Sequence, residues 1–119
     1  MFKIFVVLDS MLATGVGTEQ LRNIVLGTAN RFGRNNTCEV LASTRVFEPE
    51  EHVRILAIHY GSTGDVLKRE EVSRFQNEIL GGVGVFLYPK TKFISLEFVN
   101  AGWSLFETWD IEEQIKETE

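Results

Sequence analysis

Cysteine and histidine are scarce in this chain of 119 residues, and their scarcity excludes several kinds of site. Cys38 is the only cysteine, so no disulfide can form within the chain, and a lone thiol favours a reducing compartment such as the cytoplasm. His52 and His59 are the only histidines, and together with Cys38 they lack the spacing of metal ligands. We therefore expect no metal and no other cofactor, and we expect His52, which lies in an acidic turn, to be solvated.

Long apolar runs and an excess of positive charge are also missing. No run approaches the roughly 20 apolar residues of a membrane-spanning helix, so no contact with a membrane is expected. A net charge of −5 argues against non-specific binding to nucleic acid and permits a basic protein partner. The hydrophobic fraction of 44% can fill one core, which predicts a single domain over residues 1–119, with residues 100–119 as a C-terminal extension.

Apolar spacing predicts a regular succession of strands and helices. In chain order these are a strand over residues 2–8, a helix over 18–32, strands over 38–47 and 53–60, and a helix over 65–80. Thr18 and Asp65 are the expected N-caps of the two helices, and the expected stops are Gly33 for the first and Gly81 with Gly82 for the second. The same succession therefore occurs twice: a strand, a Thr-Gly loop, a helix and a glycine stop. Either a βαβ unit has been duplicated, or the same turn residues are used twice.

The stretch Val83–Val99 is predicted to be a β-hairpin at the centre of the sheet. Two β-prone runs, 83–88 and 93–99, flank the polar loop 89–92. The segment after this hairpin allows two interpretations. Residues 103–109 form either another strand followed by a short acidic helix, which we prefer, or the beginning of a helix capped by Ser104.

This order of elements is that of the split βαβ arrangement found in ferredoxin-like folds. We therefore predict an α+β domain with an antiparallel βαββαβ sheet and a C-terminal strand or helix extension. Right-handed crossovers would place both helices on one face of the sheet, with the first and third strands as parallel neighbours at its centre.

The other face of this sheet is expected to be apolar. Alternation assigns to it Phe5, Val7, Leu41, Phe47, Leu56 and Ile58. A contiguous apolar surface of this kind is rarely left open, so we expect the C-terminal segment or a second subunit to cover it. The residues predicted to form a protein interface are Phe5, Phe47, Trp103, Phe106 and Trp109.

A catalytic hypothesis follows from the parallel pairing of the first and third strands. Their carboxyl ends would bring Asp9 and Ser10 close to His59 and Tyr60, which are residue types that can form a nucleophile and base. The alternative is that these residues are merely polar side chains at strand ends, and no catalytic motif is present. An enzymatic activity is therefore the less favoured expectation.

Two further binding hypotheses rest on loops and arginines. The Gly-rich loops before the helices could hold an anion, with Thr14, Gly15, Gly17, Thr18, Ser62, Thr63 and Gly64 as the candidate residues. Arg22, Arg31 and Arg34 give a basic edge to the first helix, which could contact nucleic acid. The simpler interpretation is a helix end with cations near its negative pole, so a nucleic-acid partner is not expected.

The function that these observations favour is protein binding without catalysis. We expect a small cytoplasmic regulator, adaptor or inhibitor, such as a viral accessory protein, which acts through the apolar sheet face and an acidic, tryptophan-containing tail. Its partner could be basic, and the chain is expected to form a homodimer. The alternatives are a small-molecule or anion-binding module, which could be a hydrolytic enzyme, at Asp9, Ser10, His59 and Tyr60, and a nucleic-acid binder.

Overall fold

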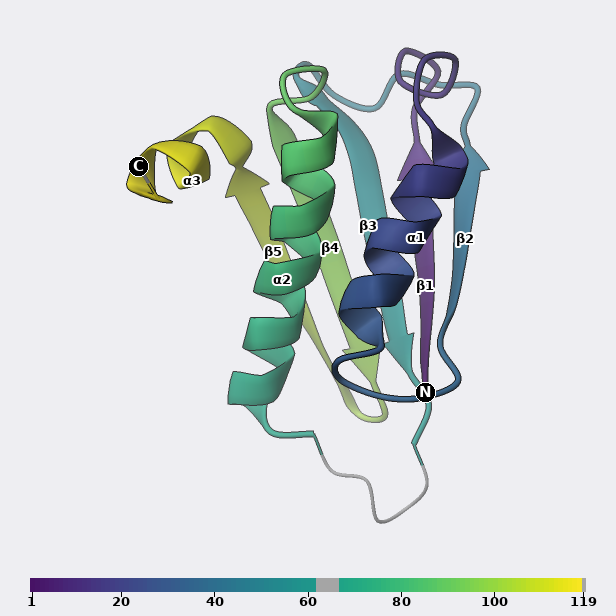
Figure 1. Cartoon of the computed structure of the whole chain (residues 1–119), viewed down its shortest axis with the longest axis vertical. Coiled ribbons are helices and arrows are strands. Elements are labelled where there is room, and N and C mark those ends of the chain that lie inside the picture. The colour runs from purple at the N-terminus through teal and green to yellow at the C-terminus, as the bar shows by residue number, and fades with distance from the viewer. Residues whose placement is uncertain (62–66, 119) are drawn as a thin grey trace.

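The computed structural model describes residues 1–61 and 67–118 as an α+β fold with a mixed, five-stranded sheet (Figure 1). The elements are β1 Phe2–Leu8, α1 Thr18–Ala29, β2 Thr37–Ala42, β3 Glu51–His59, α2 Arg69–Leu87, β4 Phe93–Asn100, β5 Trp103–Asp110 and α3 Ile111–Thr118. The strand order is β2-β1-β3-β4-β5. Asp65, the expected N-cap of the second helix, lies outside the described residues.

The sheet is built from two βαβ units that run in opposite directions. β1 and β2 pair in parallel around α1, and β3 and β4 pair in parallel around α2. β1 and β3 are the expected central neighbours, but they are antiparallel, and the first pair joins Phe2 to His59. The prediction of a purely antiparallel, split βαβ sheet was therefore wrong.

The connection between β2 and β3 explains why element order alone misled us. β2 ends at Ala42, earlier than predicted, and residues 43–50 carry the chain past the end of β1 to reach β3. Backbone hydrogen bonds hold this connection to β1, from Ser43 N to the Leu8 oxygen (2.7 Å) and from Ser10 N to the Arg45 oxygen (2.9 Å). A connection of this length permits the crossing, whereas a tight hairpin would have forced β2 and β3 together.

The predicted hairpin over Val83–Val99 was also wrong, because α2 continues to Leu87. The glycines in this part of α2 allow close packing and do not end the helix. A Cβ atom at Gly82 would lie 3.1 Å from Ile24 of α1, and one at Gly84 would lie 3.3 Å from Ile111. Close contacts from α1 and from the C-terminal segment outweigh the poor helix propensity of glycine.

The C-terminal segment follows the preferred interpretation, a strand and then a short helix. β5 pairs antiparallel with β4 across a turn in which Gly102 has a φ of 88°, and it forms one edge of the sheet. Gln76 of α2 donates from Nε2 to the Leu105 oxygen of β5 (3.2 Å). α3 projects from the body of the molecule, and its first residue, Ile111, is buried at the base (Figure 1).

The core lies between the sheet and the layer formed by α1 and α2. The apolar face of β1 is buried there, as its alternation predicted, and Ile4 and Val6 are at most 1% exposed. Phe75 of α2 stacks on Phe2 with ring centroids 4.5 Å apart, and Phe98 of β4 lies edge-on to Phe75 at 5.6 Å. These rings connect α2 to both halves of the sheet.

Candidate interaction surface and polar clusters

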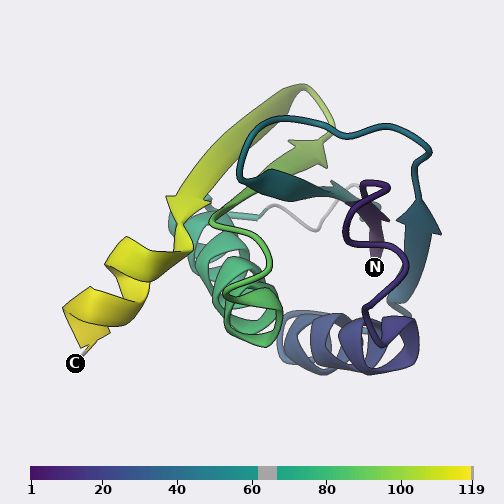
Figure 2. The same ribbon diagram turned by 90° about the horizontal axis from the view of Figure 1, so that it is seen from above.

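No helix of the described residues covers one face of the sheet, and we call this the open face. Figure 2 shows α1 and α2 together on the opposite side, with the connection between β2 and β3 bowing away from them. Strand register places Phe5, Leu56, Glu97 and Phe106 in one row across four strands of the open face. Its apolar side chains are Phe5, Val7, Leu41, Leu56, Ile58, Phe93, Val99 and Phe106.

Among the apolar side chains of the open face, exposure is greatest toward the two edges of the sheet. Phe106 of β5 is 66% exposed and Leu41 of β2 is 44% exposed, while the central side chains Phe5 and Leu56 are partly buried. Phe47, from the β2–β3 connection, lies against Arg54 with the guanidinium 4.5 Å from the ring centroid. The alternation in the sequence therefore predicted which strand residues share this face.

Charged side chains of both signs accompany these apolar groups. Lys3 and Arg54 supply two positive charges, and Glu39, Glu51, Glu97 and Asp110 supply four negative charges. Arg54 also lies 3.9 Å from Glu51. The strand positions of the open face therefore place two cations among its anions, in a chain whose net charge is −5.

The two tryptophans do not cover the open face, which corrects the role expected for the C-terminal segment. Trp109 pairs with Ile94 and Trp103 pairs with Asn100, positions whose side chains lie on the helix side of the sheet. Trp103 stacks on Phe98 at 6.0 Å between centroids. Because β5 extends the sheet instead of folding over it, Phe106 is the one aromatic residue of this segment on the open face.

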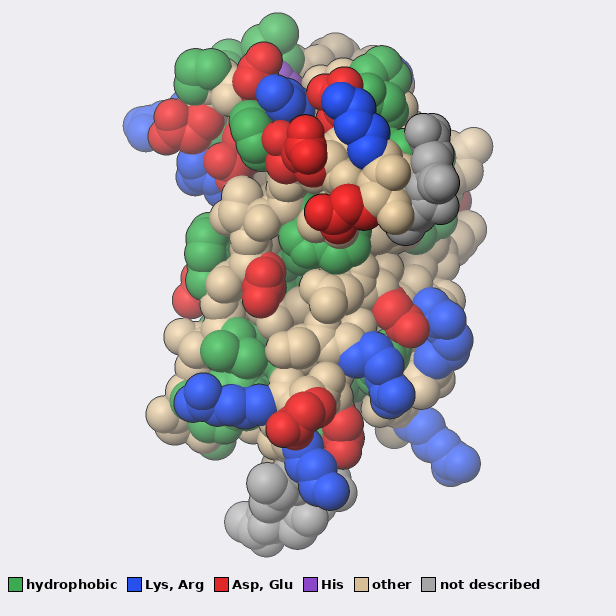
Figure 3. All heavy atoms as spheres, turned by 90° about the vertical axis from the view of Figure 1, so that its left-hand side faces the viewer, with side chains coloured by type: hydrophobic (Ala, Val, Ile, Leu, Met, Phe, Trp, Pro, Cys, Tyr) green, Lys and Arg blue, Asp and Glu red, His purple; other side chains and the backbone are tan. Residues whose placement is uncertain are grey.

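The tail is also less uniformly acidic in three dimensions than its sequence suggests. Glu112 pairs with Lys116 at 3.6 Å, and Asp110 accepts a hydrogen bond from Glu113 N (3.2 Å) at the start of α3. Figure 3, which views the side bearing α2, β5 and α3, shows positive and negative side chains interspersed with hydrophobic ones. An apolar groove of about 180 Å³ lies at the base of α3, with Trp109 and Ile111 in its wall.

The proposed catalytic set does not come together. Because β1 and β3 are antiparallel, Leu8 pairs with Val53 and Phe2 pairs with His59. Asp9 and Ser10 therefore lie at one end of the sheet, while His59 and Tyr60 lie at the other. The expectation that these four residues converge was wrong, and the error follows directly from the assumed parallel pairing.

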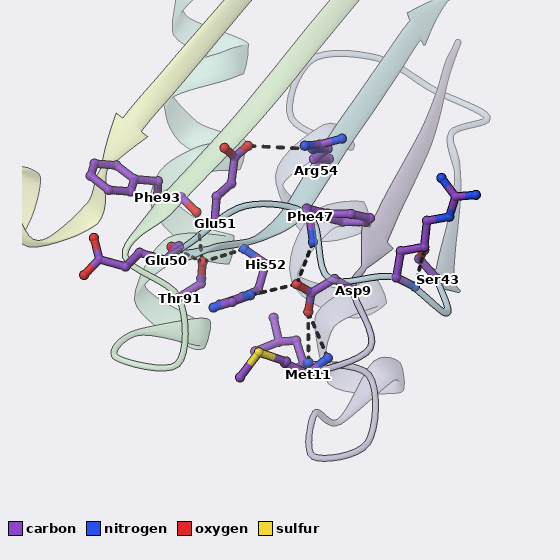
Figure 4. A network of polar contacts seen from close by, with 12 residues as sticks. Asp9, Met11, Ser43, Phe47, Glu50, Glu51, His52, Arg54, Thr91 and Phe93 are labelled. Atoms are coloured by element: carbon purple, nitrogen blue, oxygen red, sulfur yellow. Dashed lines mark hydrogen bonds and ion pairs between the residues drawn. The ribbon is translucent and has the colours of Figure 1, made fainter.

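Asp9 instead meets His52, a contact that the sequence analysis missed (Figure 4). Asp9 is fully buried, and its Oδ2 accepts hydrogen bonds from His52 Nδ1 (2.7 Å) and from Phe47 N (3.2 Å). Its Oδ1 accepts from Met11 N (3.0 Å) and Leu12 N (3.2 Å). The side chain of His52 is only 12% exposed, so the prediction that it would be solvated was wrong.

The network continues from His52 into the connection between α2 and β4. His52 N donates to Thr91 Oγ1 (3.1 Å), and this hydroxyl lies 3.1 Å from the Glu50 oxygen and 2.9 Å from the Phe93 oxygen, with one hydrogen to donate. Three loops that are distant in the sequence are thus tied to one carboxylate. The contact between Asp9 and His52 could have been predicted from an antiparallel pairing of β1 with β3. That pairing places the residue after Leu8 beside the residue before Val53.

The chemistry of this network is that of a buried, stabilised carboxylate. Burial by itself raises the pKa of Asp9, but the hydrogen bonds from His52, Phe47 and Leu12 outweigh it, and the pKa lies below its ordinary value of 3.8. The bond to Asp9 keeps the proton of a neutral His52 on Nδ1, as in the Asp-His pairs of many sites. Among the described residues, however, no group of three His, Cys, Asp or Glu side chains could hold a metal ion.

The lowered pKa predicts a specific dependence of stability on pH. Since the carboxyl has a lower pKa folded than unfolded, its contribution to stability is present above pH 3.8 and is lost as the pH falls through the folded pKa. We expect the difference in the free energy of unfolding between the wild type and Asp9→Asn to become smaller as the pH falls. Urea unfolding at several pH values from about 6 to about 3 measures this difference. A difference that stays constant over this range would contradict this assignment.

The residues proposed for anion binding are separated as well. Figure 1 shows α1 beginning at the end of the sheet where α2 finishes, so the two helix N-termini lie at opposite ends. Around the first loop, Gly17 is the N-cap of α1 without a side-chain cap, Thr14 and Thr18 flank it, and the Gly15 oxygen accepts from Lys90 Nζ (2.9 Å). Ser62, Thr63 and Gly64 lie outside the described residues.

Two of the arginines proposed to bind nucleic acid are paired with glutamates, and the only cysteine is buried. Arg22 pairs with Glu19 (2.9 Å) and Arg31 pairs with Glu78 (3.1 Å), which offsets the positive charge of this helix edge. Burial raises the pKa of the Cys38 thiol to about 11, so this thiol stays protonated near neutral pH.

Comparison with known proteins adds no assignment. No protein-family model matches the sequence, and no curated protein matches it either. None of the helices in the described part of the chain is both long enough and apolar enough to cross a membrane. Any function for this chain therefore depends on the geometry of its own surfaces.

Proposed function

We propose that this chain is a non-enzymatic protein-binding module, a regulator, adaptor or inhibitor, that acts through the open face of its sheet. The observation that carries the proposal is the set of apolar side chains on five adjacent strands, from Leu41 at one side to Phe106 at the other, over which no helix of the described residues lies. Surfaces of this kind on small domains are typically protein interfaces. The Cys38 thiol and the separated polar residues offer little support for catalysis.

The first partner we propose is a second copy of the chain. Two copies carry the same net charge of −5, so most of their surfaces repel one another. The open face is different, because it places two cations, Lys3 and Arg54, among its anions around an apolar centre. A self-complementary surface needs this combination, since each positive group must find a negative one on the identical partner.

Replacing Leu56 with arginine tests this proposal. Leu56 lies between Phe5 and Glu97 in the central row, so Glu97 can accommodate the new charge in the monomer, while the dimer would have to bury it twice. We expect Leu56→Arg to weaken the dimer at least about 30-fold, the loss typical of a central interface residue. Sedimentation velocity over a range of concentrations measures the dissociation constant.

Val85→Arg is the matched control, because Val85 is an equally apolar but 67% exposed residue on α2, away from the open face. Val85→Arg should leave the dissociation constant of the dimer within about twofold of the wild-type value. A wild-type chain that stays monomeric at about 100 μM would overturn self-association, and so would equal weakening by both variants. Binding of a different protein that Leu56→Arg abolishes would keep the open face as the binding surface but replace its occupant.

A further inference from the structure

A second concave surface lies at the end of the sheet opposite Asp9, and we call it the end cleft. It has a volume of about 400 Å³ and lies beside the N-terminus, where α1 ends. Its apolar wall includes Phe2, Phe32 and Leu67, and its polar rim includes Arg34, Asn35 and His59. Pockets that combine an apolar wall with a few convergent polar groups are the usual sites for small ligands.

The loop that carries Arg34 is held in place by several contacts. Asn36 accepts a hydrogen bond from Phe2 N (2.9 Å) and donates through Nδ2 to Asn30 Oδ1 and to the Gly33 oxygen (both 3.0 Å). A Cβ atom at Gly33 would lie 3.0 Å from the Phe2 ring, so glycine permits the close approach. Asn35 adopts a left-handed conformation, with a φ of 58°, and the loop therefore has a defined shape.

His59 is positioned independently of that loop. Its Nδ1 lies 3.3 Å from Asn100 Oδ1, which also accepts from Ala101 N (2.9 Å), and its ring lies 5.1 Å from that of Phe2. Because Asn100 contributes an oxygen, Nδ1 of His59 must carry the proton. Nε2 then remains for a ligand, as an acceptor when the ring is neutral and as a donor when it is charged.

Arg34 differs from its neighbours Arg22 and Arg31, each of which is paired with a glutamate. Within residues 1–61 and 67–118, Arg34 has neither an ion pair nor a hydrogen bond from its guanidinium, and it is exposed at the rim of the end cleft. The forked guanidinium matches the oxygens of a carboxylate or a phosphate.

We propose that the end cleft binds a small organic anion, an apolar or aromatic ring that bears a carboxylate or a phosphate. Arg34 binds the anionic group, His59 binds a second oxygen of the same group, and Phe2, Phe32 and Leu67 contact the ring. All of these groups lie on the helix side of the sheet, at the end opposite Asp9. The end cleft and the open face can therefore be occupied independently of one another.

Titration of the full chain with phenyl phosphate, followed by two-dimensional amide NMR and by calorimetry, tests this proposal. Saturable binding is expected, with shifts centred on residues 33–35 and 59. Arg34→Gln should weaken it at least about tenfold, which corresponds to the loss of a charge-assisted contact. Arg45→Gln, which removes an exposed arginine at the opposite end of the sheet, should change the affinity less than about twofold.

Two companion titrations distinguish the parts of the ligand. Benzoate shows whether a carboxylate serves as well as a phosphate, and either preference supports a site for an organic anion. Inorganic phosphate should bind at least about tenfold more weakly than phenyl phosphate, because it cannot contact the apolar wall. Equal binding of the two phosphates, equal effects of the two arginine variants, or no saturation by either phenyl phosphate or benzoate would each overturn the proposal.

Discussion

Replacing Asp9 with asparagine should lower the free energy of unfolding by about 3–5 kcal/mol, because two of the four hydrogen bonds to this carboxylate would be lost and a bond to a charged group contributes about 1.5–3 kcal/mol. Both oxygens of Asp9 act as acceptors, and each accepts two hydrogen bonds. An asparagine amide would turn one of these oxygens into an NH₂ group, which would then face N–H donors. Either the N–H groups of Met11 and Leu12 or those of Phe47 and His52 would then lose their acceptor.

Urea unfolding followed by circular dichroism near neutral pH measures this effect. Asp110→Asn is the matched control, because Asp110 caps α3 through a bond from Glu113 N, and asparagine caps a helix about as well. We expect the control to change stability by less than about 0.5 kcal/mol. A loss below about 1 kcal/mol for Asp9→Asn would mean that the loops do not depend on this carboxylate.

Phe75→Ala should be similarly costly, at about 3–5 kcal/mol, because it leaves a cavity where several rings meet. Phe75 is 1% exposed and contacts Phe2, Phe98 and Phe32, with the Phe32 centroid 5.3 Å away. These contacts join α2 to β1, to β4 and to the turn after α1. Little else in the core could move to fill the space, since its neighbours belong to different elements.

Phe86→Ala on the same helix provides the comparison for Phe75. Phe86 is 37% exposed, and alanine is the better helix former, so we expect a loss below about 1 kcal/mol. Urea unfolding at a fixed, low protein concentration keeps any self-association from contributing. If both variants lost the same stability, the ring cluster would not be the centre of the core.

Local patterns in the sequence were a sound guide to single elements and to the faces of strands. The period-two alternation of β1 correctly separated Ile4 and Val6, which are buried, from Phe5 and Val7, which lie on the open face. The helix α1 was also predicted in the right place, although its N-cap is Gly17 instead of Thr18 and it ends at Ala29, before Gly33. These features depend on neighbours two to four residues apart, which the sequence displays directly.

The polar sites could not be predicted in the same way. Asp9 and His59 were chosen as candidates because each follows or ends an apolar strand, but which residue each one meets depends on strand direction. The antiparallel pairing of β1 and β3 gave Asp9 the partner His52 and left His59 beside Phe2 and Asn100. Reversing the direction of one strand moves its end residues to the opposite end of the sheet. The local sequence pattern is the same in both directions.

The sequence by itself determined that the chain has one core, alternating strands and helices, and an apolar second sheet face. Only the tertiary structure decided that α2 runs through its glycines to Leu87, because the contacts that favour glycine there come from Ile24 and Ile111. It also decided the strand order, through the crossing of residues 43–50 over the end of β1. In both cases the deciding energy lies in contacts between segments that are far apart in the chain, which no local pattern records.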